Sequence, residues 1–241
     1  MAEKYLVYGA TGGVGSALCR RLAAEGRALH LVGRDAARLQ ALAGELDASW
    51  SAVDVLQPDA FAQVAQDAGP TLAGLAYAIG SINLKPFERM TAGDFDRDFR
   101  LNASGAALAV QAALPALRAA PARSSVVLFS SVAAGRGFPM HASIGMAKAA
   151  VDGLVRSLAA VLSPAVRINA IALSLTDTPL AQHIIASDRL REAISAAHPL
   201  GRLGTPEDAA AIAAFLLSSQ ADWITGQILG VDGGRGAVAG K

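Results

Sequence analysis

Short runs of apolar residues alternate along the chain with longer stretches that carry a helical pattern. In the longer stretches apolar side chains recur every three or four residues, so that those of residues 151–162 fall on one helix face: Val151, Leu154, Val155, Leu158 and Leu162. The short runs are almost continuously apolar, which is typical of strands covered on both faces. They predict strands at residues 4–9, 28–33, 48–53, 72–79, 125–131, 166–172 and 228–232.

This alternation of strands and helices predicts an α/β fold with a doubly wound, seven-stranded parallel sheet flanked by helices. The 241 residues suffice for one such domain with a sizeable core. No linker, repeat or low-complexity segment interrupts the pattern, so we expect residues 1–241 to form a single domain. In a sheet of this kind ligands bind beyond the carboxyl ends of the strands, so the residues that follow each strand carry the most information.

Composition and charge narrow the classes of partner. The chain is 53% hydrophobic and carries a net charge of +1 with no basic run, which disfavours nucleic-acid binding. No apolar run approaches the roughly 18 residues of a membrane span, and the start "MAEKYLVYG" does not resemble a signal peptide. Cys19 is the single cysteine and is expected to be buried in a helix. We therefore expect a cytoplasmic protein that binds neither nucleic acid, membrane nor metal.

A glycine-rich turn follows the first predicted strand, in the segment "GATGGVGSAL". Gly9, Gly13 and Gly15 allow a tight turn and bring backbone N–H groups close to a pyrophosphate at the start of a helix. Thr11 and Val14 belong to the same turn and are candidate contacts for a dinucleotide. An ordinary strand-to-helix turn is the alternative interpretation.

The end of the second predicted strand bears on the choice of cofactor. An acidic residue there would bind the adenosine ribose hydroxyls, but the position holds Gly33, followed by Arg34. A guanidinium favours a 2′-phosphate, so we expect NADPH, with NAD the less favoured cofactor. The alternative is that Arg34 is solvated and pairs with Asp35 or Glu45.

The residues after the third predicted strand are candidates for the adenine end of the cofactor. Asp54, which precedes Val55, can accept a hydrogen bond from the adenine amine. It could equally cap a helix that begins near Pro58.

Together with these features, motifs along almost the whole chain resemble the short-chain dehydrogenase/reductase family. They comprise the glycine turn, Asp54-Val55, Asn102 in "LNASG", Ser130-Ser131, Lys148 in "AKAAVDGL", "RINAIALSLTDTPL" (167–180) and "GRLGTPEDAAAIAAFLLSSQADWITGQILGVDGG" (201–234). The resemblance implies a Rossmann fold and a nicotinamide-dependent oxidoreductase. It also implies that Lys148 binds the nicotinamide ribose, Ser131 holds the substrate oxygen and Asn102 supports a water. Gly80 and Thr178 would contact the nicotinamide end of the cofactor.

The chain departs from the family at the position of its usual acid. That acid is a tyrosine 13 residues after Ser131 and four before Lys148, where this sequence has Ile144. Isoleucine cannot donate a proton, and general acid catalysis is typically worth ~10²–10⁴-fold. The usual Asn-Asn-Ala-Gly after strand four is replaced by Tyr77-Ala78-Ile79-Gly80, and the usual Pro-Gly after strand six by Leu173-Ser174.

His141 is the candidate substitute for the missing acid. It lies seven residues before Lys148, and a histidine can donate a proton near neutral pH. The bacterial enoyl-acyl-carrier-protein reductases, a branch of the same superfamily, place their tyrosine at this spacing, and "HASIGMAK" is similar to their motif. The alternative is that His141 is an exposed residue at the start of the helix. Ser143 is expected to cap that helix, and Tyr77 to be a packed aromatic.

The segment 178–200 corresponds to the family's substrate lid. Its residues Leu180, Ile184 and Ile185 either face a hydrophobic substrate or pack on the core, and Phe138 and Met140 could line the same pocket. The sequence shows no arginine cluster for a carboxylate or phosphate substrate. By resemblance, the alanine-rich helices expected at 94–119 and 143–162 form homodimer or homotetramer interfaces.

The sequence thus predicts an NADP(H)-dependent oxidoreductase with a non-standard proton donor, either His141 or a water near Asn102. Its substrate is expected to be a small or medium, fairly apolar carbonyl compound or enone. The alternative is a catalytically inactive module that binds NADP, and the sequence does not name the substrate.

Overall fold

The computed structural model describes residues 4–238, which contain seven strands and eight α-helices. The strands are β1 (Lys4–Tyr8), β2 (Ala28–Gly33), β3 (Ser49–Ala52), β4 (Gly74–Tyr77), β5 (Ser124–Ser131), β6 (Val166–Leu173) and β7 (Ile228–Val231). The helices are α1 (Gly13–Ala24), α2 (Ala36–Leu46), α3 (Ala60–Ala68), α4 (Ala92–Phe99), α5 (Gly105–Arg118), α6 (Ala142–Leu162), α7 (Asp188–Ala196) and α8 (Pro206–Leu217).

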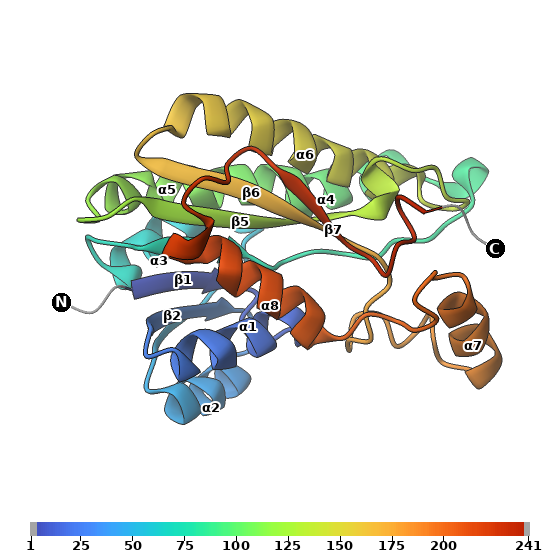
Figure 1. Ribbon diagram of the computed structural model, residues 1–241, viewed down its shortest axis with the longest axis horizontal. Coiled ribbons are helices and arrows are strands. Elements are labelled where there is room, and N and C mark those ends of the chain that lie inside the picture. The colour runs from blue at the N-terminus through green and yellow to red at the C-terminus, as the bar shows by residue number, and fades with distance from the viewer. Residues whose placement is uncertain (1–3, 239–241) are drawn as a thin grey trace.

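The strands form one parallel sheet in the order β3-β2-β1-β4-β5-β6-β7 (Figure 1). The chain builds the sheet outward from β1 to β3, then returns to place β4 on the other side of β1. Each of the seven apolar runs coincides with one of these strands to within two residues at either end, so the predicted Rossmann-type architecture is confirmed. The reversal between β1 and β4 is the switch point at which such sheets bind ligands.

Two layers of helices cover the two faces of the sheet (Figure 1). Tyr5 and Val7 of β1 pack with buried residues of α1, α2 and α8 on one face. Leu6 and Tyr8, which alternate with them along the strand, pack with α3, α5 and α6 on the other. Both faces are therefore apolar, which is why the strand sequences are continuous apolar runs without alternation. Cys19 lies in this core as expected, and its burial raises the pKa of its thiol to about 12.

The helix expected at 94–119 is interrupted by a π-helical turn, Arg100–Ser104, between α4 and α5. The hydroxyl of Tyr77 donates to the carbonyl oxygen of Leu101 inside this turn, at 2.8 Å. A Cβ atom on Gly105 would overlap that hydroxyl, so a glycine is required at the start of α5. Tyr77 is thus the buried aromatic that was expected, and its contact shapes the segment that carries Asn102.

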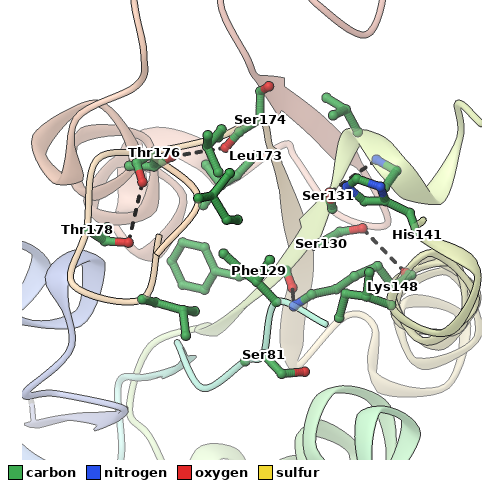
Figure 2. A pocket seen from close by; sticks show the side chains of 18 of the residues that line it. Ser81, Phe129, Ser130, Ser131, His141, Lys148, Leu173, Ser174, Thr176 and Thr178 are labelled. Carbon is green, nitrogen blue, oxygen red and sulfur yellow. Dashed lines mark hydrogen bonds between the residues drawn. The ribbon is translucent and has the colours of Figure 1, made fainter. Parts of the chain in front are cut away.

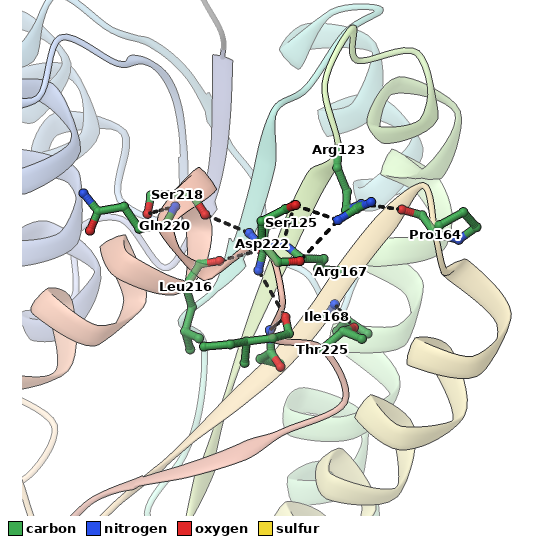
Figure 3. A network of polar contacts seen from close by, with 12 residues as sticks. Arg123, Ser125, Pro164, Arg167, Ile168, Leu216, Ser218, Gln220, Asp222 and Thr225 are labelled. Carbon is green, nitrogen blue, oxygen red and sulfur yellow. Dashed lines mark hydrogen bonds and ion pairs between the residues drawn. The ribbon is translucent and has the colours of Figure 1, made fainter.

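A polar network holds the amino ends of β5 and β6 together, at the edge of the sheet remote from the ligand end (Figure 3). The buried guanidinium of Arg167 donates to the carbonyl oxygens of Ser218, at 2.9 Å, and Ile224, at 3.3 Å. Arg123 bonds the carboxylate of Asp222 at 2.7 Å. Within residues 4–238, no helix is both long and apolar enough to cross a bilayer.

Candidate active site

A cavity of about 350 Å³ opens where the carboxyl ends of β4, β5 and β6 meet the start of α1 (Figure 2). This volume lies in the range of small-molecule sites. Most of the side chains around it are apolar, and several polar ones converge between them. The cavity brings together these sequence candidates: Val14, Gly80, Ser131, His141, Ile144, Lys148 and Thr178.

The glycine turn has the close packing that a bound dinucleotide requires. Gly9 has a φ of +76°, and a Cβ atom there would lie 2.7 Å from the carbonyl oxygen of Ala78. A Cβ on Gly13 would lie 2.7 Å from the Thr178 side chain, and one on Gly15 would overlap the backbone of Gly9. Helix α1 starts in this turn without an acidic residue in its first turn, so its free N–H groups suit an anion.

Arg34 is exposed at the end of β2 and has no ion pair among the residues that the structure describes. Its two alternative partners are engaged elsewhere. Glu45 pairs with Arg20 at 2.7 Å, and the carboxylate of Asp35 accepts a backbone N–H in the first turn of α2. The alternative, in which Arg34 pairs with one of these acids, is therefore not formed, and its guanidinium is open to an external anion.

Arg38, which sequence reasoning missed, reaches the glycine turn from α2. Its guanidinium donates to the carbonyl oxygen of Thr11 at 2.9 Å. Arg38 lies in the first turn of α2, four residues after Arg34, and a second arginine so soon after the end of β2 is the signal that could have identified another cation at the adenosine end.

Asp54 does not cap a helix, so that alternative is wrong. Its carboxylate accepts the backbone N–H of Leu56 at 3.0 Å and holds the turn after β3. Helix α3 begins later, at Ala60, with Asp59 as its N-cap residue. Val55 beside Asp54 is buried.

Lys148 projects from α6 into the floor of the cavity (Figure 2). The ammonium Nζ donates to the carbonyl oxygen of Phe129 at 2.7 Å. Burial lowers the pKa of Lys148 from 10.5 to about 8, against the opposing charges of Asp152 and Asp98. Because a pKa of about 8 lies above neutrality, Lys148 is mainly an ammonium at pH 7.

Asn102 lies beside Lys148, within a buried polar network. Its amide nitrogen donates to the carbonyl oxygen of Asp98 at 2.8 Å and to Ser81 Oγ at 2.9 Å. Its Oδ1 is buried and has no partner among the described residues. A Cβ atom on Gly80 would lie 3.1 Å from this oxygen and 3.4 Å from Lys148 Nζ, so the glycine leaves space between the two.

The buried carboxylate of Asp98 organises this network, and sequence reasoning missed it. It accepts hydrogen bonds from Ser81 at 2.7 Å, from Asn83 at 3.2 Å and from Ser143. Ser143 therefore does not cap α6, and that prediction is wrong. The signal in the sequence was an acid one helical turn before Asn102.

His141, at the N-cap position of α6, also lines the cavity. Its Nδ1 lies 2.7 Å from the carbonyl oxygen of Pro139. A carbonyl only accepts, so Nδ1 carries a hydrogen and Nε2 is an acceptor whenever the ring is neutral. The ring also contacts Phe138, with the centroids 5.5 Å apart. Ile144, one turn into the helix, is buried and presents only hydrocarbon.

Two cavity serines have different partners. Ser131 Oγ accepts the backbone N–H of Ala133 at 3.1 Å, which leaves its own hydrogen available for donation. Ser174 Oγ lies 2.7 Å from His198 Nε2, and His198 Nδ1 lies 2.7 Å from the Ile194 carbonyl oxygen. The carbonyl requires a hydrogen on Nδ1, so in the neutral ring Nε2 accepts from Ser174. Ser174 and His198 are 24 positions apart in the sequence, and no motif indicated this pair.

The segment 178–200 contains a turn followed by helix α7, which stands away from the sheet in Figure 1. Leu180 and Ile184 line the cavity, whereas Ile185 is buried outside its lining. Phe138 lines the cavity as expected. Met140 does not line it; this residue lies in a turn with a φ of +65°, and its side chain is half exposed.

Comparisons with known proteins identify the family to which the chain is similar. A family model described as Enoyl-(Acyl carrier protein) reductase matches residues 9–235. The chain is 33% identical to an uncharacterized oxidoreductase of Mycobacterium tuberculosis, over 96% of this chain and 90% of that one. It is 32% identical to the cis-4-hydroxycyclohexanecarboxylate dehydrogenase of Sinomonas cyclohexanicum, over 97% of this chain and 96% of that one.

Comparison with solved structures also finds short-chain dehydrogenases/reductases. A short-chain type dehydrogenase/reductase from Mycobacterium ulcerans superposes with a TM-score of 0.92 and 29% sequence identity, covering 99% of this chain and 91% of the other. The family match extends over most of the sequence and over the parallel sheet that carries the cavity. The chain therefore belongs to the short-chain dehydrogenase/reductase family of nucleotide-binding oxidoreductases.

Proposed function

We propose that the protein is an NADP(H)-dependent oxidoreductase acting on a small or medium, fairly apolar carbonyl compound or enone, with a non-standard proton donor. The observation that carries the proposal is the convergence of Ser131, His141 and Lys148 on one apolar cavity beside the glycine turn. Ile144, which we assign to the position of the family's tyrosine, lines the same cavity and supplies no proton.

The residues present fit a nicotinamide dinucleotide. Gly9, Thr11, Gly13, Val14 and Gly15 would hold its pyrophosphate through the backbone. Asp54 and Val55 would lie at its adenine, and Gly80, Lys148 and Thr178 at its nicotinamide end. When bound, the nicotinamide supplies or accepts a hydride.

The two arginines at the adenosine end support NADP over NAD. Arg34 has no partner among the described residues, and Arg38 is held against Thr11. A 2′-phosphate would receive charge-assisted hydrogen bonds from this pair. The ribose hydroxyls of NAD would have no carboxylate to bind, because position 33 is a glycine and not an acid.

The proton then comes from His141 or from a water held at Asn102. Ser131 donates a hydrogen bond to the substrate oxygen, and the nearby ammonium of Lys148 stabilises developing negative charge. Because Nδ1 of His141 is bound to Pro139, only its Nε2 can face a substrate, and it carries a proton only in the imidazolium form. An enone suits this site because solvent can protonate the enolate later.

The substrate side supports a compact, apolar molecule. Leu180 and Ile184 from the segment 178–200, which we interpret as the lid, face the cavity with Phe138. The relative named for cis-4-hydroxycyclohexanecarboxylate is by its name a dehydrogenase of a small ring alcohol, which is consistent with this size.

The test combines cofactor titration with a turnover screen. NADPH should bind at least about tenfold more tightly than NADH, and Arg34→Gln with Arg38→Gln should remove that preference. With ketones, aldehydes and enones, Lys148→Ala should abolish turnover, and His141→Ala should lower it by roughly 10²-fold if the ring supplies the proton.

Another outcome would favour a second function. Tight NADPH binding, no turnover by the wild type with a broad panel, and turnover gained by Ile144→Tyr would identify a non-catalytic NADP-binding module. The buried hydrocarbon of Ile144 at the cavity is the observation behind that alternative. Preference for NADH would contradict the role given to Arg34.

A further inference from the structure

Arg235, in the turn after β7, places an incompletely paired guanidinium on the cavity. The group lies 5.3 Å from the centroid of the Phe138 ring, and its Nη1 donates to the carbonyl oxygen of Ala197 at 2.7 Å. Its other N–H groups have no hydrogen bond or ion pair within residues 4–238. Stacking on an aromatic ring holds the guanidinium in place while leaving its edge free for a ligand.

The charge around the cavity is unbalanced. Lys148 and Arg235 are the charged side chains among the described residues that line it, and no aspartate or glutamate does so. Asp232, the acid nearest to Arg235 in sequence, accepts the backbone N–H groups of Gly234 and Gly236, each at 2.8 Å. A guanidinium beside an apolar cavity that contains no anion is unfavourable, and a ligand with a negative charge would compensate it.

This cation lies away from the glycine turn that would bind the cofactor phosphates. Arg235 stacks on Phe138, whose ring contacts His141 at the start of α6. The glycine turn instead packs against Thr178, and Figure 2 shows Thr178 and His141 on opposite sides of the view. The anion that Arg235 can bind is therefore part of the substrate and separate from the cofactor.

We propose that the substrate is an oxo acid or hydroxy acid whose carboxylate binds Arg235. Its apolar body would lie against Phe138, Leu180 and Ile184, with its reacting oxygen at Ser131. The inference rests on the proposed function and deepens it by naming the anionic end of the substrate. The sequence-based expectation was a fairly apolar substrate, with no arginine cluster for a carboxylate. The single Arg235 was not considered, because it reaches the cavity from a turn far along the chain from the other lining residues.

The competing role for Arg235 is structural. Its bond to Ala197 ties the turn after β7 to the carboxyl end of α7 and could serve only to hold the lid. A tether would affect charged and uncharged ligands equally, whereas an anion site discriminates between them. A matched pair of probes therefore separates the two roles.

The experiment measures binding of benzoate and of uncharged, isosteric benzamide by calorimetry, with and without NADP⁺. The wild type should bind benzoate at least about tenfold more tightly than benzamide. Arg235→Gln should bring the two affinities within about twofold by weakening benzoate alone, and Arg235→Lys should keep an intermediate preference. Arg118→Gln is the control, because Arg118 is an exposed arginine at the end of α5 that does not line the cavity; it should keep the preference.

Equal affinities, no binding of either probe, or a benzoate preference that survives in Arg235→Gln would overturn the proposal. Equal weakening of both probes in that variant would assign Arg235 to the tether role alone. Because the readout is binding, it is independent of turnover. A benzoate preference that depends on Arg235 but is accompanied by no redox activity would refute the proposed function and leave this site standing. Reduction of neutral ketones without any preference for carboxylates would support the proposed function and refute the carboxylate site at Arg235.

Discussion

At the scale of single residues, Lys148 shows how a buried charge links stability to pH. Its pKa in the folded chain is about 8, whereas an unfolded lysine titrates near 10.5, because burial disfavours the ammonium. Between these values the unfolded chain holds a proton that the folded chain has released. Stability therefore rises with pH in this window, and the cost of burying the ammonium is fully present below about pH 8.

Lys148→Met removes this dependence and keeps a side chain of similar length. We predict that the free energy of unfolding of the wild type rises relative to that of Lys148→Met between pH 8 and 10, by up to roughly 1.4 kcal/mol per pH unit. Urea denaturation at a series of pH values measures the difference. Parallel curves of unfolding free energy against pH for the two proteins would show that the pKa of Lys148 is not lowered in the folded state.

The candidate site could be predicted residue by residue only where a motif carried it. Lys148 and Ser131 follow from local motifs, and the structure brings both to the cavity with His141. Asp98 could not be anticipated, because its importance depends on a contact with Ser143, 45 residues away. Ser143 looked like a cap because serine at a helix start usually is one. A buried carboxylate is a stronger partner for its hydroxyl than a backbone N–H.

At the scale of elements, continuous apolar runs predicted the strands because both faces of the sheet are covered. The π-helical turn between α4 and α5 was not predictable from periodicity, since the residues on either side continue the same helical pattern. It depends on Tyr77, which belongs to another element and bonds a carbonyl inside the turn. Helix irregularities set by a distant side chain leave no local signal.

The polar network at the amino ends of β5 and β6 supports a stability prediction. Arg167 is 4% exposed, its pKa is lowered by burial against the opposing charge of Asp222, and it bonds the Ser218 carbonyl oxygen. Arg167→Met would remove this donor, so we expect a loss of about 1–3 kcal/mol in the free energy of unfolding. Arg20→Met, at an exposed ion pair, is the control and should cost less than about 1 kcal/mol.

Urea denaturation of both variants measures these losses, and cofactor titration supplies a second readout. Because the network lies at the end of the sheet remote from the cavity, Arg167→Met should bind NADPH like the wild type. A loss no larger than that of Arg20→Met would mean that the network contributes little to stability.

At the scale of the whole molecule, the parallel topology explains why distant segments share one site. All carboxyl strand ends point to the same edge, so the turns after β5 and β7 meet although Arg136 and Arg235 are 99 residues apart. The sequence predicts the order of elements, and parallel pairing then places those ends together. It does not state which side chain of a long terminal turn enters the cavity, so Arg235 required the structure.

The outer face of α6 bears on assembly, for which we propose a homodimer or homotetramer. Met146, Ala149, Gly153, Ala160 and Val161 are exposed along this helix. Arg156 and Ser157 are exposed between them, but most of the face carries small or apolar side chains, which permit close helix packing against a symmetry-related copy. In a two-fold interface each residue contributes twice, so one substitution acts on both subunits.

Gly153 gives a test that separates assembly from folding. A Cβ atom on Gly153 meets nothing within 4 Å, and the same is true of Gly44 in α2. Replacing either glycine by glutamate leaves the subunit unstrained and raises helix propensity by up to about 1 kcal/mol. If α6 forms the interface, Gly153→Glu should reduce the mass measured by light scattering, because it buries two carboxylates at the contact, whereas Gly44→Glu should keep the wild-type mass. A monomeric wild type would contradict the proposed assembly, and an unchanged mass in Gly153→Glu would place the contact on another face. Thermal denaturation of both variants is the control for folding: a lower melting temperature in Gly153→Glu than in Gly44→Glu would indicate strain within the subunit.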